Sequence, residues 1–163
     1  MKTKRSNKIR VEIFSNAYFS LTVFWEKNLI VQTQLNLPCL SQTSYLEPYS
    51  KIIEQNIRIY GQKQTVYWPN PPLDLSRLSP FSQEVLQTLF KKVPFGQTIT
   101  YGQLAHLVGK PKGARAIGQV MKNNPFPLIF PCHRVVKTTG VGQFSPLPQL
   151  KTILLQLEGV FKT

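Results

Sequence analysis

Acidic residues, cysteines and histidines are scarce in this sequence, and each shortage excludes a class of protein. Cys39 and Cys132 are the only cysteines among 163 residues, too few for a disulfide-stabilised secreted scaffold. With only two histidines besides, the chain offers no four-ligand zinc set, so we predict no metal and no other cofactor. No apolar run reaches the length of a transmembrane helix, and residues 11–16 interrupt any signal-peptide core. We therefore expect a soluble protein of the cytoplasm, or of the nucleus in a eukaryotic source.

The shortage of acids leaves a large positive charge. Twenty Lys and Arg residues stand against seven Asp and Glu residues, giving a net charge of +13. Because this exceeds what solubility requires, it indicates a polyanionic partner. Nucleic acid is the leading candidate, since neutralised phosphates release counterions, and an anionic membrane surface is the alternative. A hydrophobic content of 42% excludes wholesale disorder, and the length suits one medium domain or two small ones.

The first part of the chain predicts a small sheet followed by a helix. Alternation at residues 11–13 and the aromatic and β-branched residues of 18–25 and 29–35 predict three strands. Residues 49–60 have apolar residues at near-helical spacing, with Gly61 as a stop, and residues 65–68 predict a further short strand that closes the sheet.

Residues 69–72, Pro-Asn-Pro-Pro, break regular structure and mark a linker. We place an N-terminal domain at residues 1–75 and a C-terminal domain at residues 76–163. Cys39, in the first of these, is expected to be a small buried apolar residue.

The second part of the chain carries helices with clear boundaries. Ser79 and Pro80 begin one as N-cap and first helical residue, apolar residues at a spacing of four follow, and residues 94–96 end it. Thr100 and Gln103 form a capping-box pattern. It opens a short helix that carries Leu104, Leu107 and Val108.

A basic turn at residues 110–113 leads to a third helix at about 114–122. Two short helices around a tight glycine-containing turn predict a helix-turn-helix. The inner face of the third helix comprises Ile117, Val120 and Met121, and the outer face Arg115, Gly118, Gln119 and Lys122. An outer face of small and basic residues suits a DNA groove, although a merely solvated face is the alternative. The ten basic and two acidic residues of 79–163 favour DNA.

Cys132, between Pro131 and His133, is the candidate nucleophile. The apolar runs on either side of Pro131-Cys132-His133-Arg134 predict a fixed thiol at the edge of a strand. Only a thiolate attacks carbon, and His133 can accept the thiol proton if a third group orients its ring. Because neighbouring side chains on an extended chain point to opposite sides, a Cys132–His133 contact requires a bend or a bridging water.

Glu158 is the candidate third group. It follows a helix marked by Leu150, Ile153, Leu154 and Leu157, which stops at Gly159. It is the only acidic residue after residue 84. Spacing alone leaves open whether it orients the histidine or makes a surface ion pair.

Motifs of defined order and spacing run from about Ser79 to Gly159. They comprise Val93-Pro94-Phe95-Gly96, Thr100-Tyr101-Gly102-Gln103-Leu104-Ala105, Ala114-Arg115-Ala116-Ile117-Gly118, Asn124-Pro125 with Pro127, Pro131-Cys132-His133-Arg134-Val135-Val136 and Glu158-Gly159. Together they resemble the O6-alkylguanine-DNA alkyltransferases, DNA-repair proteins that move an alkyl group onto their own cysteine. Residues before Ser79 match this family only in size and in their β-then-helix order.

The resemblance implies an α+β fold, with a ribonuclease-H-like three-stranded sheet and helix followed by a winged-helix domain. It implies a single-turnover methyltransferase that repairs O6-methylguanine in double-stranded DNA as a monomer. O4-methylthymine is a second candidate substrate. Nucleotide flipping from the minor-groove side would deliver the base, because a thiol cannot reach a stacked guanine.

Site residues carry over at matching positions. Cys132 falls on the acceptor cysteine, His133 on the histidine that activates it through a water, and Glu158 on the glutamate that orients this histidine. Asn124 falls on the asparagine that braces the active-site loop. Arg115 falls on the arginine that fills the space of the flipped nucleotide.

Further positions imply DNA contacts and a base pocket. Tyr101 falls on the tyrosine that crowds a backbone phosphate and holds the guanine. Ala114, Gln119 and Lys122 are the other expected DNA contacts. The base pocket is expected to be lined by backbone groups of Val135 and Ser145 and by the apolar surfaces of Met121 and Pro127.

The sequence departs from the family in the loop after the active-site strand. The family usually has a Gly-rich loop with a Gly-Gly pair there, whereas in this sequence the loop is shortened by a residue near Val141 and residues 140–145 are followed by Pro146-Leu147. Because proline fixes φ, we expect a stiffer lid and poorer transfer of bulky alkyl groups.

Three other functions stay open from the residues. A lesion-binding relative that recruits other repair proteins would lack the acceptor cysteine, which is present here. A helix-turn-helix regulator gives no reason for the Cys132, His133 and Glu158 set. A cysteine hydrolase suits adjacent Cys and His poorly, and no oxyanion hole is evident.

Overall fold

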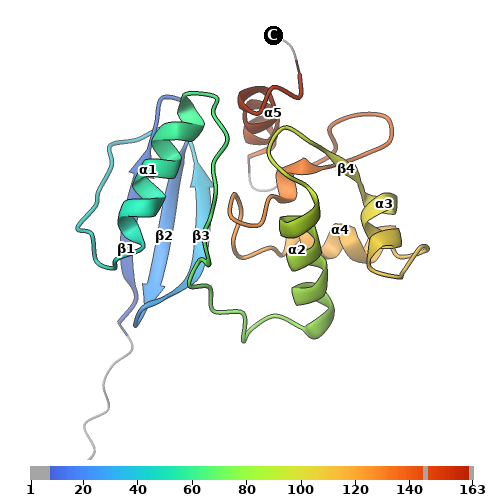
Figure 1. The fold of residues 1–163 in the computed structure, drawn as a ribbon, viewed down its shortest axis with the longest axis horizontal. Helices are drawn as coiled ribbons and strands as arrows, with labels where there is room; N and C mark the ends of the chain where they lie inside the picture. The colour runs from blue at the N-terminus through green and yellow to red at the C-terminus, as the bar shows by residue number, and fades with distance from the viewer. Residues whose placement is uncertain (1–7, 145–146, 162–163) are drawn as a thin grey trace, which may run out of the picture.

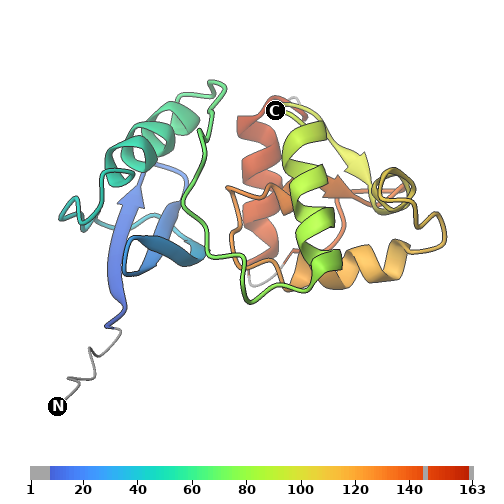
Figure 2. The same ribbon diagram turned by 60° about the horizontal axis from the view of Figure 1, so that its bottom comes forward.

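The chain folds into a three-stranded antiparallel sheet with one helix, followed by a group of helices around a two-stranded parallel sheet. The computed structural model describes residues 8–144 and 147–161. Figures 1 and 2 show the sheet with its helix on one side of the molecule and the remaining helices on the other. We call these parts the N-terminal region and the C-terminal region; the domain boundary at residues 75 and 76 stays a prediction.

The N-terminal sheet forms where the alternating pattern predicts it. Its strands are β1 (Arg10–Ser15), β2 (Ser20–Glu26) and β3 (Leu29–Asn36), paired antiparallel in that order. Helix α1 (Ser50–Gly61) covers one face. It buries Ser50, Ile53, Asn56, Ile57 and Tyr60. The three predicted strands and the helix are therefore confirmed.

The prediction of a short strand at residues 65–68 is wrong. No strand forms there, because the Tyr67 carbonyl accepts a 2.7 Å hydrogen bond from Asn56 Nδ2 of α1 and the Trp68 side chain packs into the core. Residues 65–68 therefore anchor α1 through this hydrogen bond instead of pairing with the sheet. Cys39 also differs from expectation, since it is exposed in the segment after β3.

Two other segments cover the edge of β3. Ile30 exchanges backbone hydrogen bonds with Pro72 and Asp74, at 2.7 and 2.9 Å. Further along, the Thr33 N–H donates to the Pro125 carbonyl at 2.8 Å, which attaches the C-terminal region to the sheet. Pairing of this kind satisfies backbone groups that an open edge would expose.

The C-terminal region contains the predicted helices. Its elements are α2 (Pro80–Lys92), β4 (Ile99–Thr100), α3 (Tyr101–Leu107), α4 (Ala114–Lys122), the 3₁₀ turn η1 (Cys132–Arg134), β5 (Val135–Val136) and α5 (Pro148–Leu157). The Ser79 cap and the Thr100–Gln103 capping box both form. Of the three apolar residues on the second helix, Leu104 and Val108 are buried and Leu107 is exposed.

The core is continuous between the regions. Tyr60 of α1 packs edge-on against Phe95, which lies in the turn after α2, with ring centroids 5.4 Å apart. None of the described helices has the length and apolar character needed to cross a membrane. Ser145 and Pro146, which carry part of the expected pocket and lid, lie outside the described residues.

Candidate active site

Cys132 lies in a turn and not on a strand, which corrects the sequence expectation. Residues 132–134 form the 3₁₀ turn, and β5 begins only at Val135. The Cys132 N–H donates to the Phe130 carbonyl at 2.8 Å, and the Arg134 N–H donates to Pro131 at 2.9 Å. The turn bends the chain at Cys132 and His133, yet no hydrogen bond between their side chains is present among the described residues.

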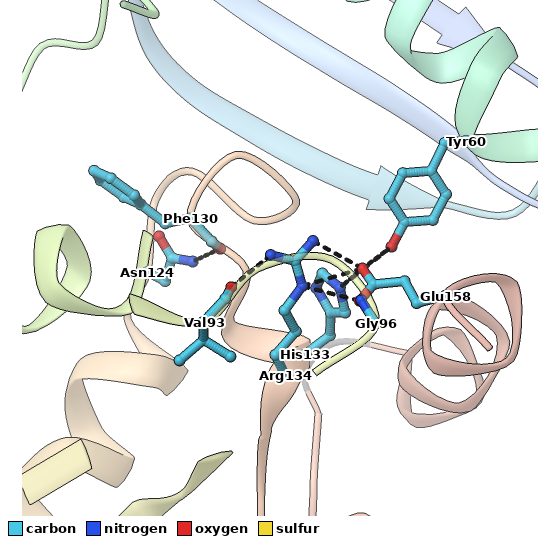
Figure 3. A network of polar contacts seen from close by, with 8 residues as sticks. All are labelled: Tyr60, Val93, Gly96, Asn124, Phe130, His133, Arg134 and Glu158. Atoms are coloured by element: carbon cyan, nitrogen blue, oxygen red, sulfur yellow. Dashed lines mark hydrogen bonds and ion pairs between the residues drawn. The ribbon is translucent and has the colours of Figure 1, made fainter. Parts of the chain in front are cut away.

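Asn124 secures the loop that leads into this turn. Its Nδ2 donates to the Phe130 carbonyl at 2.9 Å (Figure 3). Its Oδ1 accepts from the Phe126 N–H at 3.0 Å. Thr33 of β3 holds the other side of the loop, donating from Oγ1 to the Pro127 carbonyl at 2.9 Å. The loop is thus fixed by its own asparagine and by the N-terminal sheet.

The Cys132 thiol is poorly ionised without help. Its side chain is buried, with 6% of the residue exposed. Burial raises the pKa of Cys132 above its usual value, and the Asn124 side chain and the positive charge of Lys151 oppose this only in part. A base must therefore accept the proton before the sulfur can act as a nucleophile.

His133 is arranged as such a base. Its ring is fully buried, and burial lowers its pKa despite the hydrogen bond and charge of Glu158. Nε2 lies 2.7 Å from Glu158 Oε1, whereas Nδ1 is buried with no hydrogen-bond partner among the described residues. A neutral ring that donates from Nε2 leaves the lone pair on Nδ1 free to accept a proton.

Glu158 is the centre of a buried polar network (Figure 3). Arg134 donates to both carboxylate oxygens, from Nε at 2.9 Å and from Nη2 at 3.0 Å. The Gly96 N–H donates at 3.1 Å, and the Tyr60 hydroxyl donates from α1. Burial alone would raise the pKa of Glu158, but His133 and Arg134 outweigh it and hold the pKa at about 2. The carboxylate therefore stays charged.

Gly96 occupies a position that favours glycine. Its φ is +81°, and an added Cβ would lie 3.2 Å from the Glu158 carbonyl oxygen. The turn after α2 can therefore bring its N–H onto the carboxylate.

Lys151 of α5 is a buried amine beside the thiol. Its Nζ donates to the Val135 carbonyl at 2.6 Å and lies 5.9 Å from the centre of the Tyr101 ring. Burial lowers its pKa to about 8, with the Cys132 thiolate opposing the shift. The Val135 carbonyl was expected to face the flipped nucleobase. In the structure it accepts a hydrogen bond from the Lys151 ammonium.

Most of the predicted DNA and pocket residues meet at one cavity. It has a volume of about 900 Å³ and reaches Cys132. Its lining includes the predicted residues Tyr101, Ala114, Arg115, Gln119, Met121 and Lys122. Pro127 and Val135 are not among its described lining residues. On α4, Arg115, Gln119 and Lys122 are exposed and Ile117, Val120 and Met121 are buried, as the two faces predict.

Sequence reasoning missed Tyr60, Arg134 and Lys151. Two of them carried a weak signal: a tyrosine on the inner face of a helix needs a partner for its hydroxyl, and Lys151 shares a helix face with Leu154 and Leu155. Those signals do not identify the partners. Among the described residues, no group of His, Cys, Asp and Glu could hold a metal ion.

Comparison with known proteins finds a family match in the C-terminal region. Residues 80–160 match the family described as 6-O-methylguanine DNA methyltransferase, DNA binding domain. A methylated-DNA--protein-cysteine methyltransferase of Thermococcus barophilus is 44% identical over 88 residues, 54% of this chain and 49% of the relative. The human protein of that name is 50% identical over 80 residues, 48% and 39% of the two chains. The matched stretches thus span half or less of these relatives.

Solved structures match over almost the whole chain. The Mycobacterium tuberculosis OGT in complex with DNA is 26% identical, covers 91% of this chain and 92% of its own, and has a TM-score of 0.73. The O6-methylguanine-DNA methyltransferase of Pyrococcus kodakaraensis is also 26% identical, covers 94% and 100%, and has a TM-score of 0.65. The fold shared with these structures therefore extends over the N-terminal region as well as the C-terminal region.

Proposed function

This chain belongs, through residues 80–160, to the 6-O-methylguanine DNA methyltransferase family, and from that premise we propose that it repairs DNA by alkyl transfer. The acceptor is Cys132, and the substrate is O6-methylguanine in double-stranded DNA. We extend the proposal to O4-methylthymine, which presents the same methyl–oxygen bond. The observation that carries the proposal is a buried thiol that opens on a cavity beside the basic outer face of α4.

The transfer is a displacement at the methyl carbon. His133 Nδ1 accepts the thiol proton through a bridging water, with Glu158 holding Nε2. The sulfur of Cys132 forms a bond to the methyl carbon while the bond from that carbon to O6 breaks, and the electron pair stays with the guanine. Tyr101 donates a hydrogen bond to the departing base, and the proton taken from the thiol passes from His133 through solvent to neutralise the guanine anion. Burial raises the pKa of Tyr101 above its usual value, so its hydroxyl is a donor.

The base has to leave the duplex to reach the thiol. Extrusion costs a few kcal/mol and costs least where pairing is already damaged, which favours lesions. Arg115, exposed on α4, enters from the minor groove and fills the vacated space, while Tyr101 crowds the phosphate. Ala114, Gln119 and Lys122 contact the backbone. The surface that does this is a winged helix within residues 76–163, and residues 1–75 form a ribonuclease-H-like domain.

Each protein molecule reacts only once, because the product is a stable thioether on Cys132. A thioether has no leaving group, so the methyl group stays on Cys132. The protein works as a monomer without a cofactor, in the compartment that holds the DNA.

One experiment tests the proposal directly. The protein is incubated with a duplex that holds a single O6-methylguanine, and peptide mass analysis locates the added methyl group. We expect it on Cys132. Tight binding without modification would favour the lesion-binding alternative, and a Cys132→Ala variant that still demethylates would overturn the mechanism.

A further inference from the structure

The centre around Cys132 includes one side chain from the N-terminal region. We propose that Tyr60 of α1 is a positioning residue, which holds the His133 ring in the tautomer that can accept the thiol proton. The inference rests on the proposed function of Cys132 as acceptor, and it gives the N-terminal region a part in that reaction. Figure 3 shows Tyr60 reaching from α1 to the carboxylate of Glu158.

Two contacts of one hydroxyl carry the inference. The Tyr60 hydroxyl donates to Glu158 Oε1, and its oxygen lies 3.3 Å from His133 Nε2. The same Nε2 lies 2.7 Å from Glu158 Oε1. Tyrosine, imidazole and carboxylate therefore form a closed triangle with no exposed member, since Tyr60 is 1%, His133 0% and Glu158 6% exposed.

Donor and acceptor counting fixes the proton on Nε2. A carboxylate only accepts, and the single proton of Tyr60 is directed to that carboxylate, so the hydroxyl presents an oxygen lone pair to the imidazole. Nε2 then faces two acceptors and has to carry the hydrogen. The lone pair is left on Nδ1, the buried nitrogen that has no partner among the described residues.

Aromatic packing holds the Tyr60 hydroxyl beside Glu158 and His133. The Tyr60 ring meets Phe19 edge-on at 5.5 Å and Phe95 at 5.4 Å between centroids, so aromatic rings from both regions contact it. Burial and the neighbouring Glu158 raise the pKa of Tyr60 well above its usual value. The hydroxyl therefore stays protonated, and remains a donor, around neutral pH.

Loss of the hydroxyl changes the charge balance at His133. Charged and titratable groups from three elements face the His133 ring. Tyr60 comes from α1, and Arg134 and Cys132 come from the same turn as His133. Lys151 lies in α5 and Glu158 is the C-cap of that helix. Without the donor from Tyr60, the Glu158 charge acts more fully on the imidazole and favours imidazolium. A protonated Nδ1 cannot accept the thiol proton, so the acidic limb of the rate profile moves to higher pH.

The test is Tyr60→Phe, which keeps the ring and its packing. Tyr49→Phe is the matched control, because Tyr49 is the N-cap residue of the same helix and its buried hydroxyl has no partner among the described residues. Both are made in a Cys39→Ser background, so that Cys132 is the only thiol. We measure methyl transfer from the duplex, carboxamidomethylation of Cys132 by iodoacetamide against pH, and the nitrogen shifts of His133 by NMR. His106, the only other histidine, is exposed and serves as the internal reference.

For Tyr60→Phe we expect methyl transfer and carboxamidomethylation of Cys132 to slow about tenfold near neutral pH. This factor corresponds to the loss of one hydrogen bond to a charged group. The loss should shrink as the pH rises, and His133 should protonate at higher pH, while Tyr49→Phe leaves all three measurements unchanged. Unchanged rates and an unchanged His133 titration in Tyr60→Phe would overturn the inference. If the parent protein transfers no methyl group, the proposed function fails, and the iodoacetamide and NMR measurements still decide the role of Tyr60.

Discussion

The two regions each bury one glutamate, and the partners of these glutamates differ. Glu12, in β1, is 0% exposed, and its donors among the described residues are all neutral. These are Trp25 Nε1, Ser50 Oγ and the N–H groups of Ser44 and Leu46. Glu158 is 6% exposed and accepts from a guanidinium, an imidazole, a phenol and one backbone N–H.

The difference separates a carboxylate with neutral partners from one that lies in the proposed active site. Glu12 joins the loop after β3 and the start of α1 to the sheet, and none of its donors changes charge near neutral pH. Glu158 lies among groups that titrate or stay charged, next to a thiol that needs a base. Burial and residue type alone do not reveal this; the chemistry of the donors does.

The largest expected effect concerns the two cysteines, one in each region. Cys132→Ser should abolish methyl transfer, because a buried hydroxyl is a far weaker nucleophile than a thiolate. Cys39→Ser should transfer at the parent rate, since Cys39 is exposed and outside the cavity. Single-turnover assays on an O6-methylguanine duplex measure both. Full activity of Cys132→Ser would remove the functional distinction between the regions.

The two glutamates provide the next comparison. Glu158→Gln should lower the free energy of unfolding by about 3–5 kcal/mol, because it leaves the Arg134 charge buried without its partner. Glu12→Gln should cost less, about 1–3 kcal/mol, since only neutral donors lose an acceptor. Urea unfolding of both variants measures the difference. Equal losses would show that the Arg134–Glu158 pair adds nothing beyond ordinary hydrogen bonding.

Acid should weaken the protein through the C-terminal network. The folded-state pKa of Glu158 is about 2, below the usual carboxyl value, so its contribution is complete above about pH 4.5 and is lost as the pH falls toward 2. The lowered pKa of His133 also reduces stability in acid. Below about pH 6.5 the imidazole is protonated in the unfolded chain but stays neutral in the folded protein, so acid favours unfolding. Together these predict a two-stage decline of the melting temperature. Glu158→Gln should remove the lower stage, and a parent protein with a flat profile from pH 7 to pH 3 would contradict the assignment.

The smallest expected effect concerns DNA affinity. Arg115→Ala, on the outer face of α4, should weaken duplex binding about tenfold. Arg58→Ala, an exposed arginine on α1, should change it little, because the cavity and the α4 face lie in the C-terminal region. Fluorescence anisotropy at fixed salt measures both constants. Equal losses would extend the DNA-binding surface onto the N-terminal region.

Local patterns predicted the elements well, because caps and periodicity act over a few residues. The Thr100–Gln103 capping box and the boundaries of α4 were readable for that reason. The strand expected at residues 65–68 fails because Asn56, from another element, binds its backbone. Cys132 was placed on a strand edge because the 3₁₀ turn depends on backbone bonds to Phe130 and Pro131 that no side-chain pattern records.

By itself, the sequence determined the basic charge, the order of most of the elements and the motif string that contains Cys132. These follow from composition, from short-range hydrogen bonding and from a motif string of fixed spacing. The tertiary structure decided which groups surround Glu158: Arg134, His133 and Gly96 from the C-terminal region and Tyr60 from 98 positions earlier in the chain. Burial makes each of those contacts strong, and burial is a property of the assembled core, so no local pattern could assign Tyr60 to the site.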